Sequence, residues 1–384
     1  MYIIKEDSNS LEIKSWCNNI EVGALQQAKN LAKLSFAFKH ICLMPDVHQG
    51  YGMPIGGVMA TIDMIVPNAV GVDIGCGMCA LKTSFTSISI ENLKKILSEI
   101  RINIPVGFSK HSKRQELFMP ILKDELPVVK EHYDNAQKSL GTLGGGNHFI
   151  EIQKGSDGYI WVMIHSGSRN LGKQVADFYN KKAKEYCIDN EEVIKNELAY
   201  LPIDSEFGSS YLKEMSFCVD FALSNRRHMM EVIKNIISFN AGSFNILQEI
   251  NIPHNYASLE NHYGVYVYVH RKGATSAWNE ELGIIPGSQG TSSYIVSGKG
   301  NPESFSSCSH GAGRKMGRKQ AERTLNFDEE KNKLDALGIL HSIRGIKDLD
   351  EAPGAYKDID MVMLEQTDLI NIEVELKPLA VIKG

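Results

Sequence analysis

Residues 72–78 read V-D-I-G-C-G-M and place a carboxylate, Asp73, three positions before a thiol, Cys76. The glycines on either side of the cysteine permit a tight turn, so both side chains can face one point. A soft thiolate beside a hard carboxylate suits manganese, iron or zinc better than calcium or magnesium. Two ligands do not hold a metal, however, and an isolated D-x-x-C is more often a glycine turn with a buried cysteine. The metal interpretation therefore depends on further ligands elsewhere in the chain.

Three histidines lie where such ligands are expected: His148, His165 and His254 each end an apolar run beside glycine, asparagine or serine. A strand that ends in this way delivers a side chain to a pocket. One such histidine is more often a core residue, but three of them with Asp73 and Cys76 supply five nitrogen, oxygen and sulfur ligands. That set is sufficient for two metal ions with a shared thiolate. The sharpest hypothesis is that Cys76 bridges both metals.

His310 lies in S-H-G-A-G-R, residues 309–314, ahead of a basic stretch. We expect a helix to begin here, with its free backbone amides and its dipole attracting phosphate. Arg314 and Arg318 would then lie on one face of that helix. A histidine beside a bound phosphate can be a nucleophile and form a phosphoramidate. The residues alone favour this role no more than that of a histidine capping a basic surface helix.

Two other motifs indicate less. Residues 167–173, G-S-R-N-L-G-K, match the phosphate loop, but Gln174 stands where a serine or threonine should hold magnesium. Cys76 and Cys79 form a C-x-x-C, yet a second such motif is absent, so a zinc ribbon is not expected. We expect any nucleotide to be bound in another way. Asp46 and His48 are interpreted as partners that orient ligands.

The composition indicates the class of protein. The 384 residues are 43% hydrophobic and 23% charged, as in soluble globular proteins. We expect a cytoplasmic protein without a membrane partner, because no apolar run approaches the roughly 20 residues of a membrane span and the N-terminus lacks a secretory signal. Seven scattered cysteines argue against a disulfide framework. With a net charge of −5, any nucleic acid must be held by a local basic patch.

Hydrophobic periodicity predicts helices at residues 21–38, 90–100, 173–187, 212–239 and 358–370. Buried strands are predicted at residues 41–44, where Pro45 should end the strand, and at 159–164, 265–269 and 373–375. Residues 106–138 are polar and mixed, which favours a mobile surface excursion. Helices and strands do not alternate as in a doubly wound sheet. We therefore expect an α+β fold, with residues 1–384 forming a single domain of mixed sheets and surrounding helices around a central dinuclear metal site.

Nine blocks, in order over nearly the whole chain, resemble the RtcB family of RNA ligases. They are M-P-D-V-H at 44–48, V-G-V-D-I-G-C-G-M at 70–78, G-G-G-N-H-F at 144–149, I-H-S-G-S-R at 164–169, H-N-Y at 254–256, P-G-S at 286–288, G-K-G-N-P-E-S-F at 298–305, S-H-G-A-G-R at 309–314 and the closing V-I-K-G. Several blocks are specific individually, and the set is close to diagnostic.

The resemblance implies an RtcB-like fold and a ligase that depends on GTP and Mn²⁺. Such an enzyme seals RNA ending in a 2′,3′-cyclic phosphate or 3′-phosphate to RNA beginning with a 5′-hydroxyl, through a guanylated histidine and a guanylated RNA 3′ end. The compact chain favours repair of tRNA or rRNA over intron splicing. The sequence leaves open the RNA that is joined, the need for an activating partner protein, the oligomeric state and the metal used in the cell.

The matching motifs also imply residue roles. Two Mn²⁺ per chain would be bound by Asp73, Cys76, His148, His165 and His254, and GTP would guanylate His310. The nucleotide would be bound by Asn147, Glu151, Asn255, Gly287, Ser288, Gln289, Ser293, Gly311, Ala312, Gly313 and the penultimate Lys383. RNA phosphates would be held by Arg169, Arg314 and Arg318, the local basic patch that an acidic protein needs.

Three residues depart from the family pattern. Gln289 stands where methionine is usual, Cys79 where asparagine is expected, and Gly317 where serine is common. Cys79 would make the site sensitive to oxidation, and Gln289 would alter the guanosine pocket.

Two alternatives remain at this point. A two-metal RNA phosphodiesterase or phosphatase would use the same ligands without GTP, but leaves His310 and Lys383 without a role. A non-enzymatic RNA-binding protein with a structural metal would unfold when that metal is removed.

Overall fold

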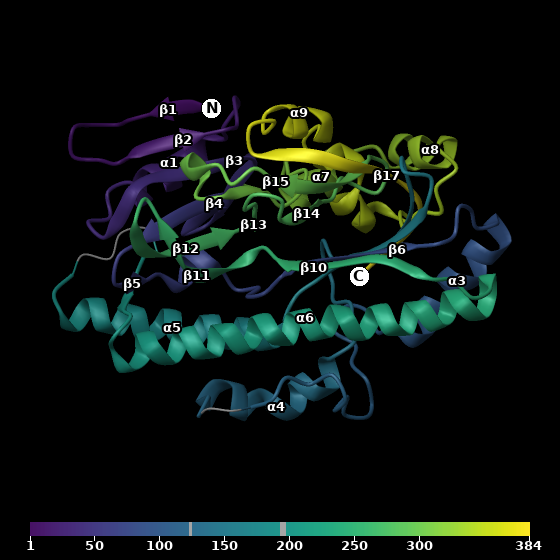
Figure 1. Ribbon diagram of the computed structural model, residues 1–384, viewed down its shortest axis with the longest axis horizontal. Coiled ribbons are helices and arrows are strands. Elements are labelled where there is room, and N and C mark those ends of the chain that lie inside the picture. Colours follow the sequence, from purple (N-terminus) through teal and green to yellow (C-terminus); the bar gives the residue numbers. More distant parts are fainter. Residues whose placement is uncertain (123–124, 193–196) are drawn as a thin grey trace.

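The computed structural model describes residues 1–122, 125–192 and 197–384. Two large sheets form the centre of the molecule (Figure 1). The first has the strand order β1 (Tyr2–Ile4), β2 (Glu12–Ser15), β3 (Ala37–Tyr51), β4 (Met53–Thr61), β12 (Val265–Lys272), β11 (Asn255–His262). The second has the order β10 (Ile246–Pro253), β6 (Gly77–Thr83), β8 (Ile160–Ser166), β7 (Phe149–Gly155), β17 (Ile370–Lys383), β15 (Ser293–Gly298), β14 (Leu282–Ile285). Two short pairs complete the described strands: β5 (Met64–Ile65) with β9 (Leu201–Pro202), and β13 (Ala274–Ser276) with β16 (Ser307–Ser309).

Long helices form a layer along one side of the sheets, where α5 (Arg169–Asp189) and α6 (Glu206–Ala241) run nearly in line with the strands above them (Figure 1). Helix α4 (Pro127–Ser139) lies beyond them and packs on α5. The remaining helices are α1 (Val22–Leu31), α2 (Pro67–Val70), α3 (Ile90–Asn103), α7 (Arg318–Thr324), α8 (Phe327–Ala336) and α9 (Ile359–Leu364), with short 3₁₀ turns η1 (Pro302–Ser304), η2 (Ile346–Glu351) and η3 (Pro353–Ala355). The predicted α+β class is confirmed.

The alternation of side chains along β8 decides what faces the site. Val162 and Ile164 pack with Ile233 of α6 in one apolar cluster. Met163, on the opposite face, packs with apolar residues of β14 and β15. Because side chains alternate along a strand, His165 shares the face of Met163 and points away from α6. The buried helix layer therefore fixes the strand from behind and leaves the other face for the site.

Several predicted boundaries are wrong. The helix predicted at 21–38 ends at Leu31, and a strand begins at Ala37. That strand does not stop at Pro45 but continues to Tyr51, with an irregular register between Leu43 and His48 that accommodates the proline.

The C-terminal region also differs from the prediction. The helix predicted at 358–370 ends at Leu364, and the tail strand runs from Ile370 to Lys383. The polar segment 106–138 contains most of α4, although residues 123–124 lie outside the described part.

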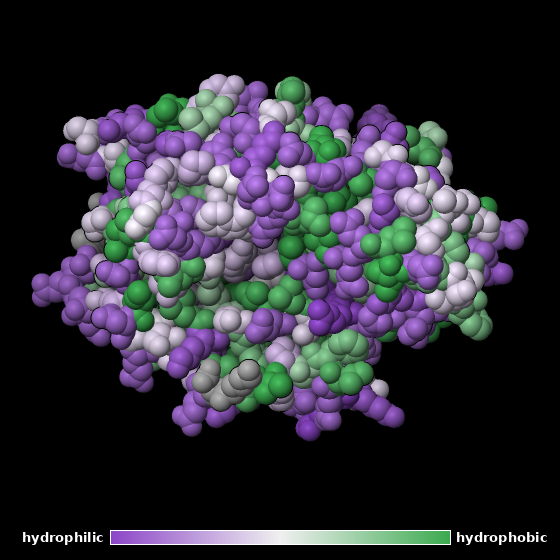
Figure 2. Space-filling view, viewed as in Figure 1, coloured by the Kyte–Doolittle hydropathy of each residue, from purple (hydrophilic) through white to green (hydrophobic). Residues whose placement is uncertain are grey.

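The surface seen in Figure 2 is mostly hydrophilic, with hydrophobic residues scattered over it and gathered near its centre. No helix in the described part of the chain combines the length and the apolar character needed to cross a membrane.

Candidate active site and metal centre

A cavity of about 760 Å³ lies between the two sheets and the segment that follows β16. This volume is typical of a small-molecule site. The predicted site residues that line it are Asp73, Cys76, Asn147, His165, His254, Asn255, Gly287, His310, Gly311, Ala312, Gly313, Arg314, Arg318 and Lys383. The predicted residues that do not line it are His148, Glu151, Arg169, Ser288, Gln289 and Ser293. The chain thus brings most of the predicted residues to one place.

Cys76, His148 and His165 form the innermost group. Their ligand atoms lie within 4.8 Å of one another, so the three side chains can hold a metal ion. The Cys76 sulfur is 3.2 Å from Nε2 of His165 and 3.5 Å from Nε2 of His148. All three side chains are buried.

The backbone fixes the tautomers of two of these histidines. Nδ1 of His148 donates to the carbonyl of Leu143 at 2.9 Å, and Nδ1 of His165 donates to the carbonyl of Asn147 at 3.1 Å. In the neutral ring the lone pair then lies on Nε2, the atom turned toward Cys76. Metal-binding histidines in proteins are commonly oriented in this way by a hydrogen bond from the second nitrogen.

Asp73 and His254 extend the group. Oδ2 of Asp73 lies 3.2 Å from Nε2 of His148, so two acceptors face each other, and a cation between them would satisfy both. Nδ1 of His254 is buried without a hydrogen-bond partner among the described residues. Its ring lies 5.2 Å from that of His165, centre to centre. An orphaned buried nitrogen beside a sulfur and two oriented imidazoles fits a metal site.

The charges of this group depend on its burial. Burial, together with the carboxylate of Asp73, raises the pKa of Cys76 well above its ordinary value. Burial also lowers the pKa values of His165 and His254 well below that of a free histidine. Burial opposes ionisation of Asp73, yet the adjacent His148 holds the pKa of Asp73 below its ordinary value. The neutral imidazoles are thus in the protonation state that binds a metal.

Helix α6 packs behind the turn at residues 73–76, which carries the candidate metal ligands Asp73 and Cys76. The buried guanidinium of Arg226 donates from Nη1 to the carbonyls of Gly75 and Ser166, at 3.0 and 2.8 Å. Its neighbour Asn225 accepts from the backbone of Gly141 at 2.7 Å and donates to the hydroxyl of Ser166 at 3.1 Å. These bonds join the Cys76 turn, the end of β8 and the glycine-rich loop. The sequence analysis missed both residues because nothing in a helical sequence marks a side chain with distant partners.

Gly75 has φ +75°, and a Cβ there would lie 2.9 Å from the backbone of Val219 on α6. The glycine is therefore required both for the turn and for the close approach of the helix. Cys79, three residues after Cys76, packs instead with Ile164 and Ile233 in the cluster behind the sheet. It does not share the site, contrary to the expectation that it would make the site sensitive to oxidation.

His310 is held by Asp46. The carboxylate Oδ2 accepts from the backbone N–H of His310 at 3.1 Å and of Gly311 at 3.3 Å, and it lies 2.6 Å from Nδ1 of His310. Nδ1 is therefore the protonated nitrogen, and the lone pair lies on Nε2. Burial opposes ionisation of Asp46, but the contact with His310 holds the pKa of Asp46 below its ordinary value. The predicted orienting role of Asp46 thus falls on His310.

The helix predicted to begin at His310 is wrong. Residues 310–317 form a loop, and α7 begins only at Arg318. Gly313 has φ +73°, and its Cβ position would lie 2.2 Å from the carbonyl oxygen of Asp46, so the chain cannot coil into a helix there. Arg314 and Arg318 do not share a helix face. The amides of His310 and Gly311 bind Asp46 and are not free for phosphate.

At the other end of the cavity, the buried carboxylate of Glu351 contacts two basic side chains, Arg314 and Lys383. Glu351 accepts from Nζ of Lys383 at 2.9 Å, from Nη1 of Arg314 at 3.1 Å and from the Tyr356 hydroxyl at 2.5 Å. The Arg314 guanidinium also lies over the Tyr356 ring, 5.0 Å from its centre. Burial opposes ionisation of Glu351, but the positive charge of Lys383 holds its pKa below the ordinary value. The sequence analysis missed Glu351 and Tyr356, whose partners are distant in sequence.

A second polar group lies under this end of the cavity. The buried Glu151 accepts from Nε2 of Gln153 at 2.7 Å, and the same amide donates to the Ser293 hydroxyl at 3.2 Å. The Ser293 hydroxyl in turn accepts from the backbone of Gly287 at 3.1 Å. Burial raises the pKa of Glu151 to about 7, against the charge of Lys383. Gly287, Ser293 and Glu151 therefore form one connected network.

The other predicted binding residues are engaged elsewhere. Gln289 donates to the carbonyl of Glu351 at 3.0 Å and accepts from the backbone of Ser342 at 3.1 Å. The Ser288 hydroxyl lies 3.0 Å from that of Thr291. These contacts brace the loop, so Gln289 supports the wall from behind.

The remaining predicted residues divide into fixed and free groups. Asn255 donates to the carbonyl of Asp73 at 3.1 Å, which braces the metal-ligand turn. Arg169 donates to the hydroxyl of Thr142 at 3.0 Å and to the carbonyl of Gly107 at 2.8 Å. Arg318 is the least engaged: its side chain is 51% exposed and Nε lies 3.9 Å from Glu351.

Comparison with known proteins shows a likeness over almost the whole chain. The family model described as tRNA-splicing ligase RtcB matches residues 27–126 and 118–384. The RNA-splicing ligase RtcB of Escherichia coli (strain K12) is 39% identical, with 97% of each chain covered. The tRNA-splicing ligase RtcB of Nanoarchaeum equitans is 33% identical, covering 94% of this chain and 91% of the relative. The RNA-splicing ligase RtcB homolog 1 of Entamoeba dispar is 31% identical, covering 97% and 84%.

Proposed function

The chain belongs to the RtcB family of ligases, and from that premise we propose that it is a GTP- and Mn²⁺-dependent RNA ligase. Its substrates are one RNA with a 2′,3′-cyclic phosphate or 3′-phosphate end and another with a 5′-hydroxyl end. The names of the relatives support RNA as the substrate. We propose repair of broken tRNA or rRNA in the cytoplasm as its task.

Two Mn²⁺ would be held by Asp73, Cys76, His148, His165 and His254. The oriented Nε2 atoms and the unpartnered Nδ1 of His254 support this assignment. The bound metal would neutralise phosphate charge and help to polarise the phosphorus that is attacked. The carboxylate of Asp73 is the ligand of the set that suits Mn²⁺, whereas the thiolate and the imidazoles also suit iron or zinc.

His310 is the proposed nucleophile. Its Nε2 attacks the α-phosphorus of GTP, a P–N bond forms, and pyrophosphate leaves. A 2′,3′-cyclic end is hydrolysed to a 3′-phosphate, whose oxygen then attacks the histidine-bound phosphorus and breaks the P–N bond. The 5′-hydroxyl of the second RNA attacks the activated 3′-phosphate, the phosphodiester forms, and GMP leaves. Asp46 keeps the proton on Nδ1 throughout and stabilises the positive charge that develops on the ring.

The guanine would lie at the end of the cavity lined by Lys383 and Tyr356. There Glu351 already neutralises Arg314 and Lys383, so this end suits a polar, uncharged base better than a phosphate. Glu151 and Ser293 would supply acceptors and donors for the base. Arg318, half exposed and weakly paired, is left for RNA phosphate.

The observation that carries this proposal is the contact of Asp46 with Nδ1 of His310, because a metal-dependent phosphodiesterase has no use for an oriented histidine nucleophile. The test mixes the protein with Mn²⁺, a cyclic-phosphate RNA and a 5′-hydroxyl RNA, with and without GTP. We expect a joined RNA only with GTP, none with His310→Ala, and unchanged joining with His132→Ala on α4. Opening of the cyclic phosphate without GTP and without joined product would instead favour the phosphodiesterase.

A further inference from the structure

The turn formed by residues 106–109 presents an aromatic side chain to solvent. Phe108 is fully exposed. The backbone N–H of Ser109 donates to the carbonyl of Val106 at 3.1 Å and closes the turn. Gly107, with φ +63°, precedes the phenylalanine. The exposed ring gains nothing from hydrophobic burial and is accessible to a ligand.

The turn is held in place on both sides. The backbone N–H of Gly107 donates to the carbonyl of Gly144 at 2.7 Å, and that of Leu143 donates to Pro105 at 3.0 Å. After the turn, the backbone N–H of His111 donates to Lys138 of α4 at 2.9 Å. The backbone that carries the phenylalanine is thus held in place, which lowers the entropy lost when the ring contacts a ligand.

The same contacts tie Phe108 to the candidate active site. Arg169, a predicted RNA-binding residue, donates from Nη2 to the carbonyl of Gly107 at 2.8 Å. A Cβ on Gly144 would lie 1.7 Å from the Arg169 guanidinium and 2.6 Å from Nδ1 of His148. Gly144 therefore lies between the Phe108 turn and two residues of the candidate site, the candidate metal ligand His148 and Arg169.

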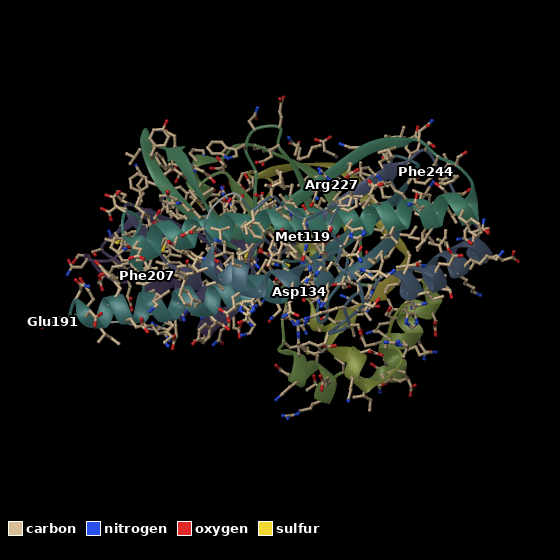
Figure 3. All side chains as sticks on the ribbon, turned by 90° about the horizontal axis from the view of Figure 1, so that it is seen from below. Met119, Asp134, Glu191, Phe207, Arg227 and Phe244 are labelled. Carbon is tan, nitrogen blue, oxygen red and sulfur yellow. The ribbon has the colours of Figure 1, made fainter. Side chains whose placement is uncertain are left out.

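The residues after Phe108 are cationic. Of the described residues, no acid lies within ion-pair distance of Lys110 or Lys113; Lys110 contacts the neutral amide of Asn135 at 3.2 Å. Arg114, in contrast, is paired with Asp134 of α4 at 2.6 Å. Figure 3, which views the molecule from below, labels Asp134 near the middle of this face. Two unpaired lysines thus follow the exposed ring in a protein whose net charge is −5.

We propose that Phe108 is a stacking platform for an unpaired base of the RNA near the joined ends, with Lys110 and Lys113 contacting the adjacent phosphates. The inference rests on the proposed function, because it requires RNA at the cavity. An aromatic face beside unpaired cations is the combination by which proteins bind single-stranded nucleic acid without reading its sequence. Arg169 lies between this platform and the candidate metal ligands. An RNA strand that contacted both Phe108 and Arg169 would therefore present its end to His310.

The chemistry of the turn favours RNA over a protein partner. The residues that follow the ring in the sequence, 109–113, are polar or cationic, and Val106 is the exposed apolar residue that shares the turn, whereas a protein-docking surface has a contiguous apolar centre. A base needs one flat apolar face with charge beside it, which is what the turn offers.

The test measures the affinity of single-stranded RNA of about ten nucleotides, carrying a 3′-phosphate or a 5′-hydroxyl, by fluorescence anisotropy without GTP and at one ionic strength. We expect Phe108→Ala to weaken binding of at least one of these strands about five- to a hundredfold, and Phe108→Trp to retain it. Phe239→Ala removes another exposed phenylalanine, at the far end of α6, and should change nothing. Blunt RNA duplex, whose bases are already stacked, should bind wild type and Phe108→Ala alike.

A 2-aminopurine placed in turn at each position of the strand gives a direct signature, because stacking quenches its fluorescence. Quenching at one position that is lost in Phe108→Ala and kept in Phe108→Trp supports the platform. Equal affinity of wild type and Phe108→Ala for both strands overturns it, as does an equal loss for duplex and single strand. Because binding is measured without GTP, these outcomes are independent of whether His310 is guanylated, which labelled GTP tests separately.

Discussion

The two ends of the cavity are built in opposite ways. At the Cys76 end, the atoms that could bind a metal are left unpaired. Two imidazoles turn Nε2 toward the sulfur, and Nδ1 of His254 has no partner among the described residues. At the Glu351 end, the charges are already paired, because Arg314 and Lys383 both contact the buried carboxylate. One end therefore offers lone pairs to a cation, and the other offers a neutralised, hydrogen-bonding wall.

This difference would let one cavity separate the parts of GTP, the proposed substrate. Metal ions held by the unpaired ligand atoms at the Cys76 end would draw the phosphates, because a bound metal neutralises their charge. At the Glu351 end, a phosphate could bind only if one of the existing ion pairs broke. A base could instead bind there by hydrogen bonds and by contact with Tyr356. His310, held by Asp46, lies beside the Cys76 end, with its ring 4.7 Å from that of His254, centre to centre.

The largest expected effect comes from removing the shared ligand at the Cys76 end. Cys76→Ala should abolish tight metal binding and lower RNA joining by more than about 100-fold, because second-sphere changes at metal sites alone cost 10- to 100-fold. Metal content after dialysis and the joining rate measure this. Cys79→Ala is the matched control, since that thiol packs behind the sheet. If Cys76→Ala kept two tightly bound metals and full activity, the bridging hypothesis would be wrong.

Glu351→Gln tests the paired end. It leaves the partly buried Arg314 and Lys383 without their counter-charge, so we expect the free energy of unfolding to fall by about 2 kcal/mol and the KM for GTP to rise roughly tenfold. Glu330→Gln removes another buried acid, which is bonded to Gly354 at 2.9 Å outside the cavity. It should destabilise the protein and leave the KM unchanged. An unchanged KM in Glu351→Gln would contradict the assignment of this end to guanine.

Glu151 provides a further test of the difference between the two ends. It is a buried acid near the Glu351 end, and it has no ion-pair partner among the described residues. Burial raises the pKa of Glu151 in the folded protein to about 7 from its ordinary value of 4.5, so folding takes up a proton between these pH values. Stability should therefore fall as pH rises from 4.5 to 7, by about 3 kcal/mol, and then level off. Urea unfolding at pH 5 and 8 should show this loss in wild type and a smaller one in Glu151→Gln. Parallel pH profiles of the two proteins would exclude it.

The sequence predicted well those features of the structure that depend on local patterns. The turn around Cys76 and the histidines after apolar runs could be found because glycines and strand ends lie within a few residues of the ligand. The buried strand at 159–164 and the helix starting after Ser89 follow from periodicity and capping, and the Ser89 hydroxyl indeed accepts from Asn92 at 3.2 Å.

It predicted poorly where partners are distant along the chain. Arg226, Asn225 and Glu351 look like ordinary helix or turn residues until folding brings their acceptors or donors close. The tail strand pairs with β7 and β15 along most of its length, and those pairings extend it well beyond the predicted 373–375. The helix expected at His310 fails because Gly313 must approach the backbone of Asp46, a contact more than 260 residues apart in sequence.

The most direct test of the account is to incubate the protein with Mn²⁺ and GTP labelled at the α-phosphate, and then to follow the label on denatured protein. We predict an acid-labile, base-stable label that maps to the peptide containing His310, is absent from His310→Ala and is retained in His132→Ala. Label on neither protein, or equal label on wild type and His310→Ala, would contradict the central claim that this histidine carries GMP.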